Sequence, residues 1–116
     1  MSEGRRVAVA ASRDLTAFQK NILKVLAEQS RYGLAIKREL EAYYDDEVNH
    51  GRLYPNLDDL VEAGYVEKNA LDKRTNEYGL TEEGMEAVRD DLRWSLEHFL
   101  TDEERCEFVE SIIEGE

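Results

Sequence analysis

The sequence predicts a mainly helical domain with one small β-hairpin, followed by two further helices. Three observations support this fold class: three consecutive amphipathic helical patterns, a change to alternating residues after Gly64, and a return to helical spacing after Thr81. The chain has 116 residues, of which 41% are apolar. That length suits one core, since single domains usually hold ~100–150 residues, and it leaves no room for a second catalytic domain.

The first two helices are predicted from apolar side chains that recur at spacings of three and four. The first runs from about Leu15 to Gln29, with Asp14 as a plausible N-cap. A break over residues 30–33 leads into the second helix, which ends in the acidic run 45–47. Each helix therefore has one apolar face to bury against the other.

The third helix is predicted to begin near Asn49, a residue type that is favoured at the N-cap. It ends at Gly64, which is typical of a helix C-terminus. Pro55 lies inside this pattern and lacks the backbone N–H that a helix needs. We therefore expect a late start or a bent first turn.

After Gly64 the period changes from helical to alternating. Residues 65–68 and 77–80 resemble short strands, and the polar stretch 72–76 between them resembles an exposed hairpin tip. Three helices followed by a two-stranded hairpin define a winged helix-turn-helix. We assign residues 15–81 to this domain and residues 1–14 to an N-terminal arm. This arm carries Arg5, Arg6 and Arg13 and is either a disordered tail, which is the simpler interpretation, or a segment that embraces DNA.

Residues 82–116 are predicted to form two helices, the first capped by Thr81 and the second opened by a capping box of Thr101 and Glu104. Both carry a narrow apolar seam: Met85, Val88, Leu92, Leu96, Phe99, Phe108, Val109 and Ile112. The seam either folds back on its own domain or, as we favour, forms a homodimer interface, because one small domain offers few partners for so long a stripe.

The charge is unevenly distributed along the chain. The formal net charge is −12; residues 1–80 account for −2 of it, and residues 81–116 for −10. Ten of the fifteen basic residues are arginine. A large acidic excess with few lysines favours a protein of a high-salt cytosol, where screening suppresses repulsion between carboxylates. An ordinary acidic protein is the alternative.

The run from Asn49 to Val66, followed by 76–84, resembles the PadR-type winged-helix transcription regulators. The matching positions are Gly51, Leu53, Tyr54, Pro55, Leu57, Gly64, Tyr78, Leu80, Thr81 and Gly84. The resemblance covers roughly residues 15–85 and implies a sequence-specific DNA-binding regulator, usually a repressor. Within the family, the acidic surface makes the chain similar to a redox-responsive regulator of halophilic archaea, which implies a link to oxidative stress.

Candidate DNA contacts follow from the geometry of such domains, in which the start of the third helix enters the major groove. The predicted base contacts are Asn49, His50, Arg52 and Asn56; arginine can pair with guanine and asparagine with adenine. The predicted backbone or minor-groove contacts are Tyr54, Lys37, Arg38, Lys73 and Arg74. Tyr54 could equally pack its ring under the hairpin.

Other classes of function find little support in the sequence. No phosphate loop, no nucleophile with a base partner and no spaced metal cluster is visible, so we expect no enzyme, cofactor or metal. No apolar run is long enough for a membrane span or a signal peptide, which predicts an intracellular protein. No small-molecule effector is identifiable, and acidic neighbours make the single Cys106 a poor redox sensor. The alternative function is a winged-helix adaptor that binds protein.

Overall fold

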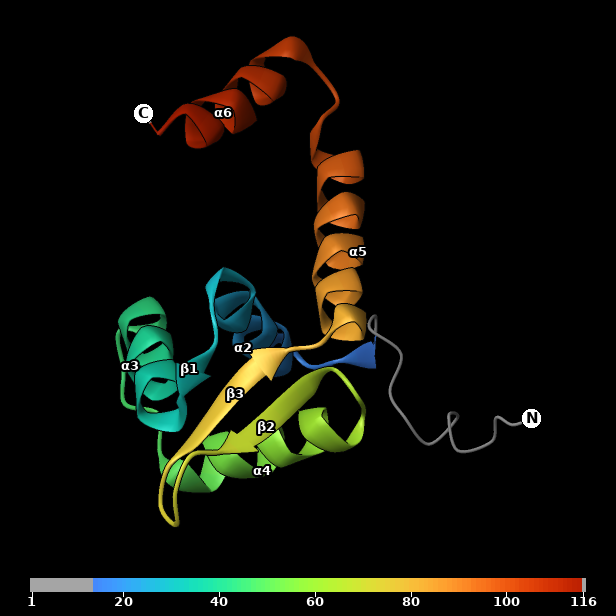
Figure 1. The fold of residues 1–116 in the computed structure, drawn as a ribbon. Coiled ribbons are helices and arrows are strands. Elements are labelled where there is room, and N and C mark those ends of the chain that lie inside the picture. Colours follow the sequence, from blue (N-terminus) through green and yellow to red (C-terminus); the bar gives the residue numbers. More distant parts are fainter. Residues whose placement is uncertain (1–13, 116) are drawn as a thin grey trace, which may run out of the picture.

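The computed structural model describes residues 14–115, which form a helical body with a small sheet and two helices that extend from it (Figure 1). The body contains α2 (Ala17–Glu28), α3 (Gly33–Tyr44) and α4 (His50–Glu62). The predicted fold class, mainly helical with a winged helix-turn-helix, is confirmed.

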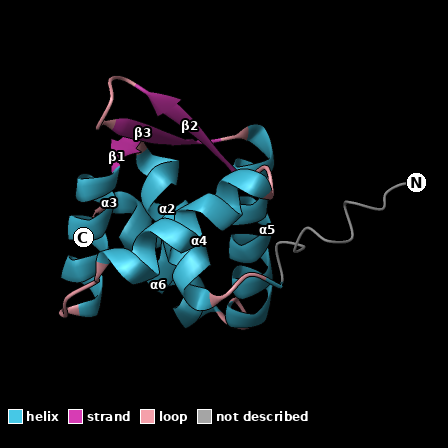
Figure 2. Ribbon diagram, turned by 90° about the horizontal axis from the view of Figure 1, so that it is seen from below, coloured by secondary structure: helices cyan, strands magenta, loops and turns pink. Residues whose placement is uncertain are grey.

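The sheet has three antiparallel strands in the order β1-β3-β2. The predicted hairpin is present as β2 (Val66–Ala70) and β3 (Asn76–Leu80), and we call it the wing. The short strand β1 (Arg31–Tyr32) was predicted only as a break between helices. It pairs with β3 on the side opposite β2, and Figure 2 shows the three strands together at one edge of the helices.

The N-terminus of α2 corrects one expectation. Thr16, not Asp14, is the N-cap: its hydroxyl accepts from the backbone N–H of Gln19, and the Gln19 side chain accepts from the N–H of Thr16, both at 3.1 Å. This reciprocal capping box satisfies two helix donors at once, whereas a cap at Asp14 would satisfy one.

The start of α4 confirms Asn49 as an N-cap, since its side chain accepts from the N–H of Arg52 at 2.9 Å. The helix begins directly at His50, so the expected late start is wrong. Its first turn is tightened instead, because the N–H groups of Arg52 and Leu53 both donate to the Asn49 carbonyl at 3.1 Å. Pro55 is accommodated inside the helix, and Gly64 follows the helix end with φ of +90°.

The core lies between the three helices and the sheet. Its buried side chains are Leu15, Phe18, Ile22, Leu23, Leu26, Ile36, Leu40, Val48, Leu53, Leu57, Leu60, Val66, Tyr78 and Ala87. Of these, Tyr78 comes from β3 and Ala87 from the start of the first C-terminal helix, so the wing and that helix are anchored to the same core.

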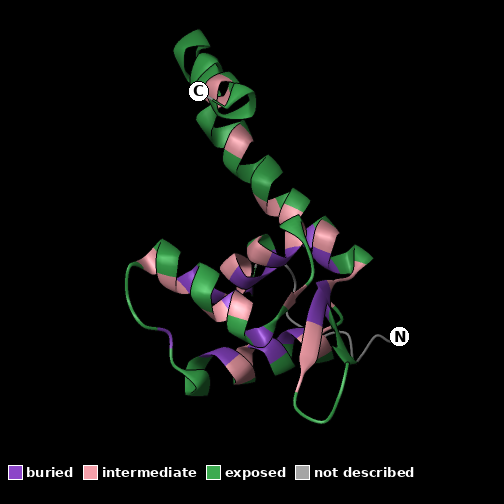
Figure 3. Ribbon diagram, turned by 60° about the vertical axis from the view of Figure 1, so that its left-hand side comes forward, coloured by how far each residue is buried: buried purple, intermediate pink, exposed green. Residues whose placement is uncertain are grey.

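The two C-terminal helices, α5 (Glu82–Phe99) and α6 (Glu103–Glu114), extend from the body and are mostly exposed (Figure 3). Thr81 caps α5, as predicted. The cap of α6 is Asp102, which accepts from the N–H of Arg105 at 2.9 Å; the expected capping box at Thr101 is wrong. The Thr101 hydroxyl instead accepts from the Arg105 guanidinium.

Within residues 14–115, none of the helices is both long enough and apolar enough to cross a membrane. The predicted basic arm, with Arg5, Arg6 and Arg13, lies outside the described residues.

Candidate nucleic-acid interface

The outward side of α4 follows from its buried side. Leu53, Leu57 and Leu60 are buried, and successive residues lie ~100° apart around a helix. Gly51, Pro55, Asp58 and Glu62 therefore occupy the centre of the outward face, opposite these leucines. The predicted base contacts lie beside that centre, on the two flanks of the helix or at its N-terminus.

Arg52 lies on the flank that faces α2. Its guanidinium carbon is 3.9 Å from the ring centroid of Phe18 and 5.9 Å from that of Tyr44, while the residue as a whole is exposed. A cation above aromatic faces is attracted by the ring quadrupole. The two rings thus hold a flexible side chain in one position beside the outward face.

Asn56 lies one turn further along the same flank and is bonded at both ends of its amide. Its Oδ1 accepts from Gln19 Nε2 at 3.1 Å, and its Nδ2 donates to the Arg52 carbonyl at 2.8 Å. An amide oxygen can accept two hydrogen bonds and an NH₂ group can donate two. One acceptor position and one donor hydrogen therefore remain.

His50 and Tyr54 occupy the opposite flank. Their rings are stacked, with centroids 5.4 Å apart and planes 6° from parallel. Tyr54 is half-buried and packs against the core, and a methyl group on Gly33 would collide with its ring and hydroxyl. The Tyr54 ring thus packs against the start of α3, and the contact of its hydroxyl with a DNA phosphate stays a prediction.

Lys37 and Arg38 lie on α3. Lys37 Nζ bonds Glu41 Oε2 at 2.7 Å, and the same carboxylate oxygen accepts from the N–H of Val48 at 3.0 Å. Both hydrogen bonds lower the pKa of Glu41; the bond from Lys37 has the larger effect and the bond from Val48 the next largest. Lys37 is thus part of the turn that leads into α4, whereas Arg38 is exposed.

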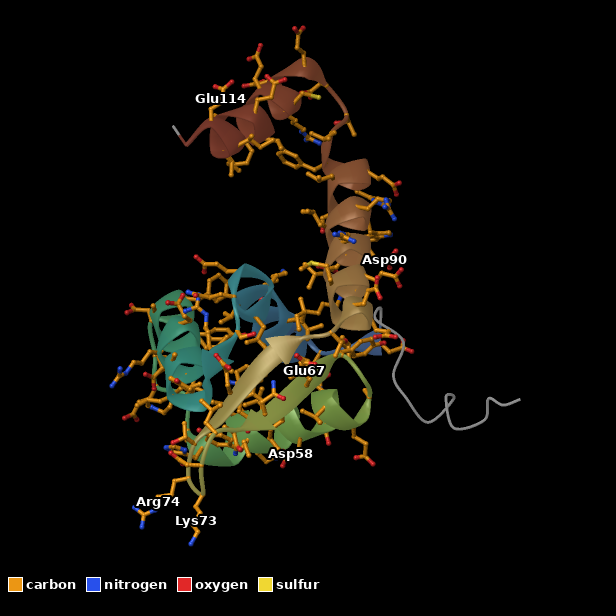
Figure 4. The ribbon with its side chains drawn as sticks, viewed as in Figure 1. Asp58, Glu67, Lys73, Arg74, Asp90 and Glu114 are labelled. Atoms are coloured by element: carbon orange, nitrogen blue, oxygen red, sulfur yellow. The ribbon has the colours of Figure 1, made fainter. Side chains whose placement is uncertain are left out.

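Lys73 and Arg74 lie at the tip of the wing, and their side chains point away from the body (Figure 4). Asp72 organises this tip, since its Oδ1 accepts from the N–H groups of Arg74 and Thr75 at 2.8 Å. The hydrogen bond from the Arg74 N–H is the largest cause of a lowered pKa at Asp72, and hydrogen bonds from Thr75 lower it further. The tip therefore presents two cations on an ordered turn.

The predicted seam of α5 and α6 divides into two parts. Val88 packs partly against the core of its own domain. Beyond it, Leu92, Phe108 and Ile112 are 55%, 56% and 61% exposed. Phe99 and Phe108 contact each other with ring centroids 5.8 Å apart, which fixes the bend between the two helices. The distal seam is thus an apolar surface that this chain does not cover.

Two residues that bear on the site were missed by sequence reasoning: Phe18, which supports Arg52, and Gln19, which bonds Asn56. The spacing of Thr16 and Gln19 is the signature of a capping box and could have located the start of α2. Nothing in the sequence pattern could have revealed these contacts, because Gln19 and Asn56 are 37 positions apart and Phe18 and Arg52 are nearly as far apart. In the described part of the chain, no three histidine, cysteine or acidic side chains are grouped to bind a metal.

The arrangement of α2, α3 and α4 with a three-stranded wing sheet defines a winged helix-turn-helix protein. Residues 22–90 match the model of the PadR-like family of transcriptional regulators, and the chain belongs to that family. The family resemblance predicted from the sequence is confirmed. No curated protein gave a significant match.

Solved structures resemble the chain over most of its length. A structure of H. salinarum RosR is 70% identical, with a TM-score of 0.88, and covers 89% of this chain and 94% of its own. A structure described as the complex of hsRosR-S1 is 69% identical, with a TM-score of 0.87 and coverage of 90% and 93%. Bacillus subtilis PadR in complex with operator DNA is 22% identical, with a TM-score of 0.56 and coverage of 66% and 47%, and shows the shared fold.

Proposed function

We propose that this PadR-like regulator binds a specific sequence of double-stranded DNA as a homodimer, with the start of α4 in the major groove. The observation that carries the proposal is the common placement of two cationic elements. The N-terminal end of α4, with Arg52, and the wing tip, with Lys73 and Arg74, lie on the same side of the molecule (Figures 1 and 3). In winged-helix domains these are the elements that contact the groove and the adjacent backbone.

The working environment and the direction of regulation are part of the same proposal. The net charge of −12 with few lysines supports a high-salt cytoplasm, in which the protein acts on the nucleoid. Membership of a family of transcriptional regulators supports a role in transcription; we propose that this role is repression, and the resemblance noted from the sequence supports a link to oxidative stress. Cys106 is an exposed residue of α6, and its neighbours in sequence include Glu104 and Glu107; we propose that any redox signal acts indirectly.

A titration across salt concentrations tests specific binding. Fluorescence anisotropy would compare a duplex from upstream of the protein's own gene with a mixed-sequence duplex of equal length, from dilute to multimolar salt. We expect a preference for the first duplex that persists at high salt, because base contacts lose less than phosphate contacts when salt is added. No preference at any salt concentration would favour the alternative function, a protein-binding adaptor.

Variants separate base readout from backbone contact. Arg52→Lys keeps the charge but cannot pair bidentately with guanine, so we expect a loss of preference of about 1–3 kcal/mol. Replacing Lys73 and Arg74 by alanine should weaken binding to both duplexes alike. Lys24→Ala removes an exposed cation of α2 that lies beside Asp91 of α5, away from the predicted DNA contacts and from the seam, and serves as the control.

The homodimer is supported by the distal seam. Leu92, Leu96 and Leu100 line a shallow apolar groove on α5, with Arg89, Arg93 and Glu97 at its edges. A second copy would cover it and place two α4 helices about one helical turn of DNA apart.

Leu92→Lys tests this interface by placing a charge in the seam. We expect a monomer by analytical ultracentrifugation, because an unpaired charge would be buried between the copies. Glu86→Lys introduces the same residue on the same helix at an exposed position outside this groove, about 120° round the helix from Leu92, and should leave the dimer intact. A monomeric parent protein, or a dimer that survives Leu92→Lys, would contradict the proposed interface.

A further inference from the structure

A directed chain of hydrogen bonds joins the N-terminus of α2 to the flank of α4. The N–H of Thr16 donates to Gln19 Oε1, Gln19 Nε2 donates to Asn56 Oδ1, and Asn56 Nδ2 donates to the Arg52 carbonyl. The donor-to-acceptor distances are 3.1, 3.1 and 2.8 Å. Because a backbone N–H can only donate, the first bond fixes the direction of all the others.

This direction decides how the Asn56 amide is turned. Gln19 must direct its oxygen towards Thr16, so only its NH₂ group can reach Asn56. Asn56 must then direct its oxygen towards Gln19 and its nitrogen towards the Arg52 carbonyl. The chain removes the freedom of an asparagine to exchange its two ends by a half-turn about the terminal bond.

The fixed amide retains what adenine requires. Asn56 keeps one acceptor position on Oδ1 and one hydrogen on Nδ2, and adenine offers the N6 amino group as donor and N7 as acceptor in the major groove. A side chain that is already oriented loses less conformational entropy when it binds. Gln19 itself is half-buried, so solvent competes weakly for its bonds.

We propose that Gln19 is a positioning residue for DNA readout: it fixes the orientation of the Asn56 amide, so that Asn56 selects adenine. The inference rests on the proposed DNA-binding function and deepens it. Phe18, the preceding residue, holds Arg52 in the same way through its ring. The first turn of α2 therefore supports two predicted base contacts, Arg52 and Asn56.

Gln19→Glu is the test, because it separates the two roles of Gln19. A glutamate at this position still accepts from the N–H of Thr16 and suits a helix N-terminus, so the fold should be retained. It cannot donate to Asn56 Oδ1, and Asn56 must turn its nitrogen towards the carboxylate instead. The measured quantity is the ratio of affinities for two duplexes, the one from upstream of the protein's own gene and the mixed-sequence one. We expect this preference to fall roughly 5- to 100-fold.

Three further variants make the result specific. Gln29→Glu adds the same charge at the other end of α2 and should leave the preference unchanged. Gln19→Met removes the bond without adding charge and should lower the preference. In an Asn56→Ala background, Gln19→Glu should have no further effect on the preference, because Gln19 acts through Asn56.

The outcomes separate this inference from the proposed function. If the parent protein shows no preference, the proposed function fails. If the parent shows a preference that Gln19→Glu and Gln19→Met both retain, Gln19 does not position Asn56. If Gln19→Glu lowers the preference equally in the Asn56→Ala background, it acts by another route and the inference is wrong. The side-chain NH₂ resonances of Asn56 provide a readout without DNA, and they should shift in Gln19→Glu and stay unchanged in Gln29→Glu.

Discussion

At the scale of single residues, Gly84 shows how closely α5 approaches the body. A Cβ at this position would collide with the backbone carbonyl of Tyr65 and lie 2.8 Å from Leu80 Cδ1. The same carbonyl accepts from the N–H of Thr81 at 3.1 Å, so it is held in place. Only a residue without a side chain allows the first turn of α5 to pack here.

Gly84 and Gly51 give a matched pair of predictions. Gly84→Ala should destabilise the fold by about 3 kcal/mol, because the obstacle is backbone and cannot turn aside. Gly51 is also helical, but a Cβ there meets only Asn49 Oδ1, at 3.4 Å. Gly51→Ala should therefore stabilise the fold by up to about 1 kcal/mol. Urea unfolding at one fixed salt concentration measures both, and equal stability of the two variants would show that the close approach does not exist.

At the scale of elements, the turn between α3 and α4 sets the position of the candidate DNA-contacting helix. The Glu41 carbonyl accepts from the N–H groups of Asp45 and Asp46, and its carboxylate accepts from Lys37 and Val48. One residue thus binds both sides of the turn. We therefore expect the entry into α4 to depend on this carboxylate being ionised.

Glu41→Gln tests this dependence through pH. The folded state lowers the pKa of Glu41 below its ordinary value of 4.5, so its stabilising effect is present above that value and is lost as the pH falls through the lowered pKa. The variant should be less stable than the parent at neutral pH, and the difference should narrow as the pH falls below 4.5. Thermal unfolding across pH measures it.

Glu39→Gln is the control for this experiment. Glu39 lies on the same helix, is exposed, and approaches Arg31 only at 3.9 Å. Exposed ion pairs contribute little, so the control should unfold close to the parent at every pH. A Glu41→Gln variant that behaves like the control would mean that the carboxylate does not hold the turn.

The elements that could be predicted from the sequence are those defined by local signals. The caps Asn49 and Thr81 and the wing strands follow from residue type and spacing. Where two capping residues stand close together, as Thr101 and Asp102 do, the local signal is ambiguous. Strand β1 could not be predicted, because two residues become a strand only through pairing with β3.

The candidate site was predictable only in part, for a related reason. Residue types such as Arg52 and Asn56 indicate which side chains could read bases. Their orientation depends on Phe18 and Gln19, which are distant in sequence and meet α4 only in the folded protein. The interaction of Lys37 with Glu41 was open to prediction, since the two lie four residues apart on one helix.

At the scale of the whole molecule, acidic and basic residues are unevenly distributed along the chain. Residues 81–116 hold thirteen of the 27 acidic residues and three of the fifteen basic ones. Glu114 lies at the end of α6, on the opposite side of the molecule from the wing tip (Figure 4). The candidate interface nevertheless includes acids, with Asp58, Asp59 and Glu62 exposed on α4. Repulsion from DNA phosphates is expected to be appreciable only where salt does not screen it.

Asp59→Lys therefore makes a prediction about salt. The variant should tighten DNA binding strongly in dilute salt and little at molar salt. The slope of log affinity against log salt concentration should become steeper by roughly one unit, because one phosphate contact is added. Glu114→Lys makes the same change of charge far from α4, so it should leave that slope nearly unchanged. Anisotropy titrations at four or more salt concentrations would measure both slopes. The contrary result would be equal tightening by Asp59→Lys at every salt concentration. That result would mean that the carboxylate excludes DNA by its shape or hydration and not by unscreened charge. The acidic surface of α4 would then need another explanation than adaptation to salt.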